Sequence, residues 1–400
     1  MKILFLCNKS PYPPIEGGPL AMNANITGLL NLGHFVKVLA MNTNKYIVNP
    51  DDLPDDYRQN TGIEYVYNDL SIKPLEAFFN LFSSRSYHVE RFISKAFERK
   101  LMEILQQDQY DIVQLEMLYM TPYVETIRKY SDAKIVLRSH NIEHLIWNRI
   151  TQNTRNRLKK AYLKTLTRKL KKYELATLEN YDGIVTISNN DAAFFRSTGT
   201  KTPITDVPFG VEISRYPFEN RKYEFPTLFH IGSMNWVPNE EGIRWFLDHT
   251  WPGINNKFPE LKFYLAGREM PDWLTKSKIN NVVVLGEVPD AKEFITSKAI
   301  MIVPLFSGSG IRIKILEGMA MGKAIISTGI GAEGIDYTKN ENILIAETPE
   351  EFLNAIEKCI SDREFCDQTG NHARKLIEEK YNLKIVTKKL EAFYHTILEN

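Results

Sequence analysis

The sequence predicts an α/β protein with two doubly wound, Rossmann-like domains that face a central cleft. Three observations support this fold class. Short apolar runs alternate with helical segments, the alternation occurs twice, and a glycine follows nearly every run in the second half. Such runs are typical of parallel strands buried on both faces, and alternating helices supply the crossovers. Because 400 residues are too many for one compact core, we expect at least two domains.

The first half contains six candidate strands. A loop with several prolines, Gly17 and Gly18 follows the first run and leads into a helix that ends near Gly33. A glycine suits the left-handed position after a helix. The predicted strands are 3–7, 35–40, 63–67, 112–115, 134–137 and 184–187.

The second half repeats the rhythm, and the join falls in residues 208–226, which lack a clear period. The amino-terminal domain is therefore 1–207 and the carboxy-terminal domain 227–382. A last helix, 383–398, can pack on either domain, including back on the first. The predicted strands here are 228–231, 263–266, 282–285, 300–303, 324–327 and 343–345, with helices at 239–249, 311–321 and 349–360.

Composition indicates a globular, cytoplasmic protein. Fifty Lys and Arg against 49 Asp and Glu argue neither for nor against nucleic acid, and we predict no such partner. Three cysteines form no disulfide framework and have no zinc-type spacing, which suits a reducing compartment. The apolar run before Asn8 is too short for a signal peptide, and no run reaches the ~18 residues of a membrane span.

The segment 304–328 reads PLFSGSGIRIKILEGMAMGKAIIST and contains a glycine-rich turn between a strand and a helix. Backbone N–H groups, the positive end of the helix dipole, Arg312 and Lys314 together form a socket for phosphate. One turn further on, Glu317 can accept hydrogen bonds from a ribose or sugar hydroxyl. This chemistry suits a nucleotide diphosphate; the alternative is an ordinary strand-to-helix turn with its charges facing water.

Ten basic residues and no acidic residue lie between Arg149 and Lys172. Interspersed apolar residues predict an amphipathic helix with a basic face. Such a face can bind an anionic membrane surface, at about 1 kcal/mol for each basic residue near the lipid. The alternative is a helix face that is simply solvated.

The order of several motifs resembles family 4 (group 1) retaining glycosyltransferases of GT-B architecture, and the resemblance covers nearly the whole chain. Each motif alone is weak, but their order and spacing are specific. They are the Gly17-Gly18 loop, SHNIEH (139–144), VTISNND (185–191), VPFGVEISRY (207–216), FHIGSMNWVPNEEGIRWF (229–246), FYLAGREMP (263–271), LGEVPD (285–290) and the segment 304–328.

The resemblance implies that the carboxy-terminal domain binds a nucleotide-sugar donor, with Gly232 and Ser233 near its phosphates. Family members commonly carry an Arg and a Lys just beyond this point, whereas residues 234–239 contain no cation. A buried, unpaired diphosphate costs several kcal/mol. We therefore expect Arg312 and Lys314 to replace the missing cations.

Further donor contacts follow from the same resemblance. Arg268 is a third candidate cation, unless it pairs with Glu269 or Glu287. Glu317 matches the second glutamate of the family's pair, which binds ribose, while Ser309 replaces the first. The Ser309 hydroxyl and backbone amides of the turn, including Gly310, are then expected to contact the sugar. Val288 matches the loop whose main chain meets the base.

In the amino-terminal domain, His140 matches a family position that faces the donor sugar and is expected to stabilise charge as the glycosidic bond lengthens. Glu143 and His144 either bind acceptor or cap their helix. Glycines at this turn allow a ligand to approach the backbone closely, and we expect Gly18 to contact the donor phosphate and Gly17 the acceptor. The alternative is that Gly17 and Gly18 form a plain turn.

The implied mechanism is front-face retention, in which the leaving diphosphate takes the proton of the acceptor hydroxyl. The enzyme is expected to be a hexosyltransferase that needs no metal and no cofactor besides its nucleotide-sugar co-substrate. We expect the acceptor to be a glycan or lipid-linked hydroxyl in cell-surface polysaccharide synthesis, and the enzyme to be cytoplasmic and peripheral at the inner face of the membrane. The alternatives are a non-catalytic nucleotide-binding homologue and a sugar-nucleotide epimerase of the same architecture. A Rossmann oxidoreductase is disfavoured because Gly17-Gly18 lacks the Gly-x-Gly-x-x-Gly spacing.

Overall fold

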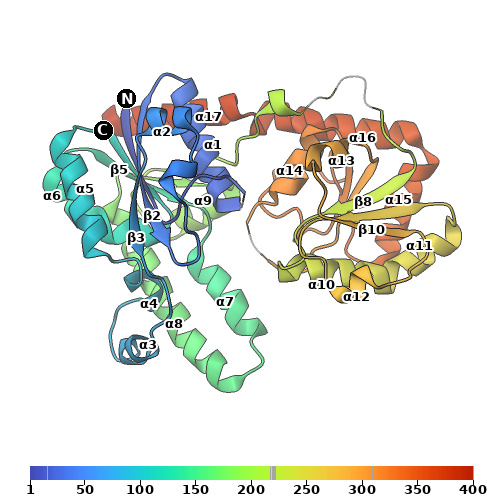
Figure 1. Cartoon of the computed structure of the whole chain (residues 1–400), viewed down its shortest axis with the longest axis horizontal. Coiled ribbons are helices and arrows are strands. Elements are labelled where there is room, and N and C mark those ends of the chain that lie inside the picture. The colour runs from blue at the N-terminus through green and yellow to red at the C-terminus, as the bar shows by residue number, and fades with distance from the viewer. Residues whose placement is uncertain (16, 217, 219–221, 309, 400) are drawn as a thin grey trace. The chain divides into compact units, whose positions relative to one another are not determined.

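The computed structural model of the chain describes residues 1–15, 17–216, 218, 222–308 and 310–399. It divides into two compact units. The first comprises Met1–Gly210 and Val386–Asn400, and the second comprises Val211–Ile385. Each unit contains a parallel sheet with helices on both faces (Figure 1). The two-sheet fold expected from the sequence is confirmed.

The sheet of the first unit has the strand order β3-β2-β1-β4-β5-β6-β7, and all of its pairings are parallel. Six of its strands lie where apolar runs predicted them. The seventh was missed because it has only three half-buried residues. The strands are β1 (Lys2–Cys7), β2 (Phe35–Thr43), β3 (Glu64–Asn68), β4 (Ile112–Glu116), β5 (Lys134–Ser139), β6 (Gly183–Thr186) and β7 (Ile204–Asp206).

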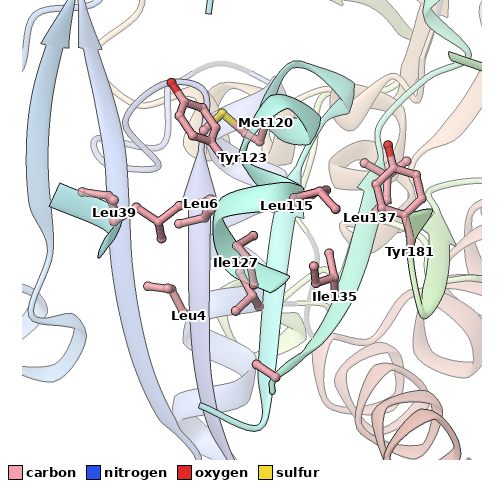
Figure 2. Packing of buried hydrophobic residues seen from close by; sticks show 14 of the residues in the cluster. Leu4, Leu6, Leu39, Leu115, Met120, Tyr123, Ile127, Ile135, Leu137 and Tyr181 are labelled. Carbon is pink, nitrogen blue, oxygen red and sulfur yellow. The ribbon is translucent and has the colours of Figure 1, made fainter. Parts of the chain in front are cut away.

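Helices cover both faces of this sheet, and side-chain alternation along β1 decides which core each residue joins. Leu4 and Leu6 pack in the core that Figure 2 shows, together with Ile127. Ile3 and Phe5 join the core on the other face. The helices are α1 (Gly17–Asn31), α2 (Asp55–Thr61), α3 (Pro74–Asn80), α4 (Tyr87–Glu90), α5 (Lys95–Gln107), α6 (Val124–Tyr130), α7 (Glu143–Asn153), α8 (Arg157–Ala176), α9 (Asn189–Ser197) and α17 (Leu383–Glu399).

The last helix, α17, packs on the first unit from Val386 onward. Val386, Leu390 and Tyr394 recur at helical spacing and join the same core as Ile3 and Phe5. Close approach requires glycine on α1, because a Cβ at Gly28 would lie 2.1 Å from Thr387 Oγ1. The carboxy-terminal helix is therefore an integral part of the first unit.

The sheet of the second unit has the order β10-β9-β8-β11-β12-β13, again parallel throughout. Its strands are β8 (Thr227–Ile231), β9 (Lys262–Ala266), β10 (Val282–Gly286), β11 (Ile300–Val303), β12 (Ala324–Ser327) and β13 (Leu344–Ile345). Its helices are α10 (Val237–Trp245), α11 (Trp251–Lys257), α12 (Asp272–Thr275), α13 (Ala291–Thr296), α14 (Ile313–Ala320), α15 (Pro349–Ser361) and α16 (Arg363–Leu376), with single π-helical turns at Phe246–Thr250 and Ile377–Tyr381.

The structure places the boundary between the units differently from a linker at 208–226. Val211 forms a bridge with Asn382 inside the second unit, so most of that segment lies in the second unit rather than between the two. In addition, the predicted helix 311–321 begins only at Ile313, because Arg312 has extended backbone at the N-cap position. Within the described residues, none of the helices has the length and apolar character needed to cross a membrane.

Candidate functional site

The candidate site residues are best considered from the carboxyl ends of the central strands, because ligands of doubly wound sheets bind there. In doubly wound sheets this place is the point at which the strand order reverses. The order reverses beside β1 and β4 in the first unit, and beside β8 and β11 in the second. Gly17 and Gly18 follow β1, His140 follows β5 and Gly232 follows β8. The residues selected from the sequence therefore lie at the carboxyl-end edge of each sheet.

Lys314, on the first turn of α14, is held by two residues that the sequence analysis did not identify. Its Nζ donates to Asn239 Oδ1 at 2.7 Å and lies 3.3 Å from His230 Nε2. His230 is fully buried, and its Nδ1 lies 2.8 Å from the carbonyl oxygen of Ile302. Because a carbonyl only accepts, Nδ1 carries the proton and Nε2 accepts from Lys314. The sequence signal that could have identified His230 is its position as a polar residue in the otherwise apolar run 228–231 of β8.

The electrostatics of Lys314 suit an anion. Burial, reinforced by the positive charge of Arg312, lowers the pKa of Lys314 to about 7. Burial and the neighbouring Lys314 charge also hold the pKa of His230 well below its ordinary value, so this imidazole is neutral. A phosphate at this place restores the charged form of Lys314 by direct attraction.

Gly232 is required by the packing around Lys314. A Cβ there would lie 2.7 Å from Asn239 Nδ2 and 3.0 Å from Lys314 Nζ. The same Asn239 amide donates to the carbonyl of Ser233 at 2.8 Å. Asn239 thereby fixes both the turn after β8 and the amino group of Lys314.

Arg312 is buried and packs against Trp236. Trp236 lies in the stretch 234–239, where the resemblance led us to expect cations. Its guanidinium carbon lies 5.1 Å from the centre of the Trp236 ring, and its Nη1 donates to the carbonyl of Gly310. A Cβ at Gly308 would lie 2.9 Å from Arg312 Nη2 and 3.0 Å from Trp236. Gly308 and Gly310 have φ of +101° and +81°, which favour glycine. The predicted contact through Ser309 falls outside the described residues.

Glu317 lies on the same helix and accepts a hydrogen bond from Tyr216 Oη at 2.9 Å. Burial raises the pKa of this carboxyl, although the bond from Tyr216 and the charge of Lys292 oppose that shift. Tyr216 closes the VPFGVEISRY motif and was not singled out from the sequence. Glu317 is thus positioned by a side chain 101 residues away in the chain.

The two remaining donor candidates lie in loops after neighbouring strands. Arg268 is exposed, and within the described part of the chain no ion pair joins it to Glu269 or Glu287. Glu269 instead accepts from Asn235 Nδ2 at 2.8 Å. Val288 is half-buried in the loop after β10. Arg268 is therefore accessible to a ligand.

In the first unit, His140 belongs to a buried polar network. Its Nε2 donates to Glu116 Oε2 at 2.6 Å, and Gln114 Nε2 donates to Glu116 Oε1 at the same distance. Arg138 Nε lies 4.0 Å from Glu116 Oε2. With its amide oriented to satisfy both groups, Asn25 accepts from Arg138 Nε at 3.0 Å and Nη1 at 2.6 Å. The network holds the His140 ring in one orientation.

Glu143 and His144 have buried side chains that bond inside the unit. The Glu174 carboxylate, from α8, accepts from the backbone N–H of Glu143 at 2.9 Å, the N–H of His144 at 3.1 Å and His144 Nδ1 at 2.6 Å. Tyr119 Oη donates to Glu143 at 2.7 Å. Glu174, rather than Glu143, therefore caps α7. The two residues contribute to the fold at this position, and acceptor contact by them stays a prediction.

Gly17 and Gly18 begin α1. A Cβ at Gly18 would lie 2.9 Å from Lys9 Cε and 3.2 Å from its Nζ. The Lys9 ammonium lies 4.7 Å from the centre of the Tyr46 ring. Glycine here leaves room for a cation at the end of β1, which sequence reasoning missed. No group of three or more candidate metal ligands occurs among the described residues, and the need for a metal is not tested by this observation.

Comparisons with known proteins find a family match in the second unit and one relative along nearly the whole chain. The family model "Glycosyl transferases group 1" matches residues 225–362. An uncharacterized 44.6 kDa protein in the cps region of Klebsiella pneumoniae is 24% identical over 413 residues, which cover 96% of this chain and 97% of that protein. The residues that match the family model extend from β8 to α15 and therefore include Lys314.

Solved structures share the fold at low sequence identity. Sucrose-phosphate synthase from Thermosynechococcus elongatus superposes with a TM-score of 0.71 at 14% identity, covering 100% of both chains. Anabaena Alr3699/HepE, solved in complex with UDP-glucose, gives a TM-score of 0.66 at 13% identity, covering 99% of this chain and 100% of that one. TarM gives 0.68 at 11% identity, covering 98% and 99%.

The fold and the family match confirm the resemblance to group 1 glycosyltransferases with GT-B architecture. Residues 225–362 match the group 1 glycosyltransferase family, and this match together with the fold supports glycosyl transfer.

Proposed function

We propose that this protein is a retaining glycosyltransferase that moves a hexose from a nucleotide-diphosphate sugar to a hydroxyl of a glycan or lipid-linked acceptor. The observation that carries the proposal is the Lys314 site, where Lys314, with a pKa of about 7, and the buried Arg312 stand at the start of α14. Two cations and a helix N-terminus match the charge of a diphosphate. The cps-region relative supports a role in cell-surface polysaccharide synthesis.

In the proposed reaction the bond between the anomeric carbon and the diphosphate oxygen breaks while the acceptor oxygen bonds to the same face of that carbon. The acceptor proton passes to the leaving phosphate oxygen. Lys314 and Arg312 stabilise the negative charge that develops on the diphosphate. Glu317 binds the ribose, and His140, oriented by Glu116, stabilises the sugar as its bond lengthens. These groups would supply the stabilisation without a metal ion.

The proposed contacts recognise the diphosphate and the ribose, so nucleotides with different bases can bind through them. Alr3699/HepE was solved with UDP and with UDP-glucose, which makes uridine nucleotides the first to test. The acceptor is proposed to be presented at the cytoplasmic face of a membrane, with the basic segment 149–172 against anionic lipid.

A thermal-shift screen against UDP-, GDP-, ADP- and CMP-sugars tests donor binding, followed by a transfer assay with the donor it selects. Glu317→Ala is expected to lose donor binding, whereas His140→Ala is expected to bind donor normally and lose turnover. Retained transfer in both variants contradicts the site assignment. Donor binding with no transfer supports a non-catalytic homologue, and conversion of the donor sugar without acceptor supports an epimerase.

A further inference from the structure

Helix α3 presents its largest apolar side chains outward. Leu75, Phe78 and Phe79 are 74%, 56% and 67% exposed, and Phe82, just after the helix, is 79% exposed. These four residues, here called the α3 apolar face, are spaced i, i+3, i+4 and i+7, so they share one side of the helix. Phe78 packs edge-on against Phe82, with ring centres 5.6 Å apart. Contiguous exposed apolar side chains of this size mark an interaction surface.

The outward orientation of this face is fixed by contacts on the opposite side. Ala77 is buried in a small cluster with Tyr87 and with Leu166 of α8. Lys169 of α8 donates from Nζ to the carbonyls of Asn80, at 2.5 Å, and Leu81, at 3.1 Å. These bonds satisfy carbonyls at the end of α3 that have no partner within the helix. Helix α3 therefore lies against α8 (Figure 1), and the exposure of Leu75, Phe78 and Phe79 places its apolar face on the side away from these contacts.

Helix α8, against which α3 packs, also contains most of the basic segment 149–172. Between residues 149 and 172 there is no acidic residue. Buried Leu163, Leu166 and Leu170 fix which side of α8 faces the unit, so the cations lie on the remaining sides. Lys169 alone of the lysines here is half-buried. The exposed basic residues of α8 are Arg157, Lys159, Lys160, Lys164, Arg168, Lys171 and Lys172.

We infer that the α3 apolar face and the exposed cations of α8 form one surface that binds an anionic phospholipid bilayer. The apolar side chains enter the boundary between headgroups and acyl chains, and the cations remain at the headgroups. The inference rests on the membrane location proposed above and specifies how it is achieved, but it does not depend on glycosyl transfer. The sequence indicated only the charge; the structure adds the apolar element.

Charge argues for lipid rather than for a second copy of the chain. In a symmetric dimer through this surface, the same patch meets itself. The seven exposed cations of α8 from each copy would then lie close together with no acidic residue of their segment to offset them. The α3 apolar face, on one helix of 7 residues, is also small beside the ~800 Å² that each partner buries in a stable interface. An anionic bilayer complements both parts of the surface.

The test is co-sedimentation of the full-length protein with vesicles of phosphatidylcholine alone or mixed with phosphatidylglycerol. Wild type is expected to bind the anionic vesicles. The triple variant Phe78→Ser, Phe79→Ser, Phe82→Ser should bind them about tenfold or more weakly, because the inserted apolar area is lost. Phe35→Ser, which changes a phenylalanine that is 73% exposed at the start of β2, is the matched control and should bind as wild type.

A charge series separates the two parts of the surface. Replacing Lys159, Lys160, Lys171 and Lys172 by Gln should abolish the preference for anionic vesicles. Replacing the exposed Lys45, Lys201, Lys262 and Lys384 by Gln leaves net charge equally lowered and should not. Wild-type binding by either the triple-serine or the first quadruple variant overturns the inference. So does a wild-type dimer in solution that the triple-serine variant converts to monomer, since a second copy then covers the face.

A fluorescence measurement covers the case in which the multiple variants fold poorly. The single variant Phe79→Trp should gain emission that brominated lipid quenches, whereas Phe35→Trp should gain emission that it does not quench. No quenching for Phe79→Trp contradicts insertion. Donor thermal shifts recorded on the same variants distinguish the outcomes, because failure of membrane binding with normal donor shifts leaves the proposed transferase function intact.

Discussion

Buried ionisable side chains of the first unit have partners that come from distant parts of the sequence. Glu116 and His140 are 24 residues apart, and His144 and Glu174 are 30 apart. His140 was selected from its motif, yet the residues that orient it were not, since nothing local in the sequence marks Gln114 or Glu116 as its neighbours. The same limitation hid His230, Asn239 and Tyr216. Their importance follows only from tertiary contacts.

Glu143 makes stability depend on pH. Burial, reinforced by the negative charge of Glu174, raises the pKa of Glu143 to about 7 against the bond from Tyr119, compared with an ordinary 4.5. A raised folded-state pKa stabilises the protein below the unfolded value, and this stability is lost as pH rises from about 4.5 through 7. Glu143→Gln should therefore be more stable than wild type by about 1–3 kcal/mol above pH 7 and similar to it near pH 4. Urea denaturation at several pH values measures this; an unchanged pH slope contradicts it.

Glu116 is fully buried beside Arg138 and His140. Glu116→Gln should lower the free energy of unfolding by about 3–5 kcal/mol, because the buried guanidinium of Arg138 loses its compensating charge. The exposed Glu103, which pairs with Lys100 at 3.4 Å, provides the control, and Glu103→Gln should cost at most about 1 kcal/mol. Equal denaturation midpoints for the two variants would show that the Arg138 network contributes nothing to stability.

Among helices and strands, apolar periodicity was sufficient to locate most elements. It failed where burial was weak or where a tertiary contact set the boundary. Strand β7 has three half-buried residues, and α14 starts two residues late because Arg312 packs on Trp236 with extended backbone. Apolar periodicity also did not decide which of the two domains the last helix packs on. That choice is decided by side chains of α17 that fit the core of the first unit, together with a glycine opposite Thr387.

The close approach of α1 and α17 can be tested at Gly28. Alanine is ordinarily favoured over glycine within a helix, yet Gly28→Ala should destabilise the protein by about 1–3 kcal/mol, since its Cβ would lie 2.1 Å from Thr387 Oγ1 and 3.1 Å from its Cβ. Gly253→Ala, in α11, meets no atom within 4 Å and should stabilise by about 0.5–1 kcal/mol. Thermal unfolding of both variants checks the pair. A stabilised Gly28→Ala protein contradicts the described contact.

For the whole molecule, the sequence was enough to predict two parallel sheets and to place the candidate site residues at the carboxyl ends of their strands. The reason is that apolar runs and following glycines are local, and parallel topology places their carboxyl ends together. The chemistry of the Lys314 site was predicted only in part. Arg312 and Lys314 were proposed to replace missing cations, but the arrangement of Trp236, His230 and Asn239 around them needed the structure.

The central claim is that Lys314 and Arg312 bind a nucleotide diphosphate. The most direct measurement is calorimetric titration of UDP, GDP and ADP into the full-length protein at several pH values, in buffers that differ in ionisation enthalpy. Because the free-state pKa of Lys314 is about 7, binding above that pH should take up a proton, and affinity should fall as pH rises further. Lys314→Met should bind about tenfold or more weakly and take up no proton. Lys276→Met, which alters an exposed lysine paired with Asp272, should match wild type. Equal affinity and equal proton uptake in wild type and Lys314→Met would contradict the claim.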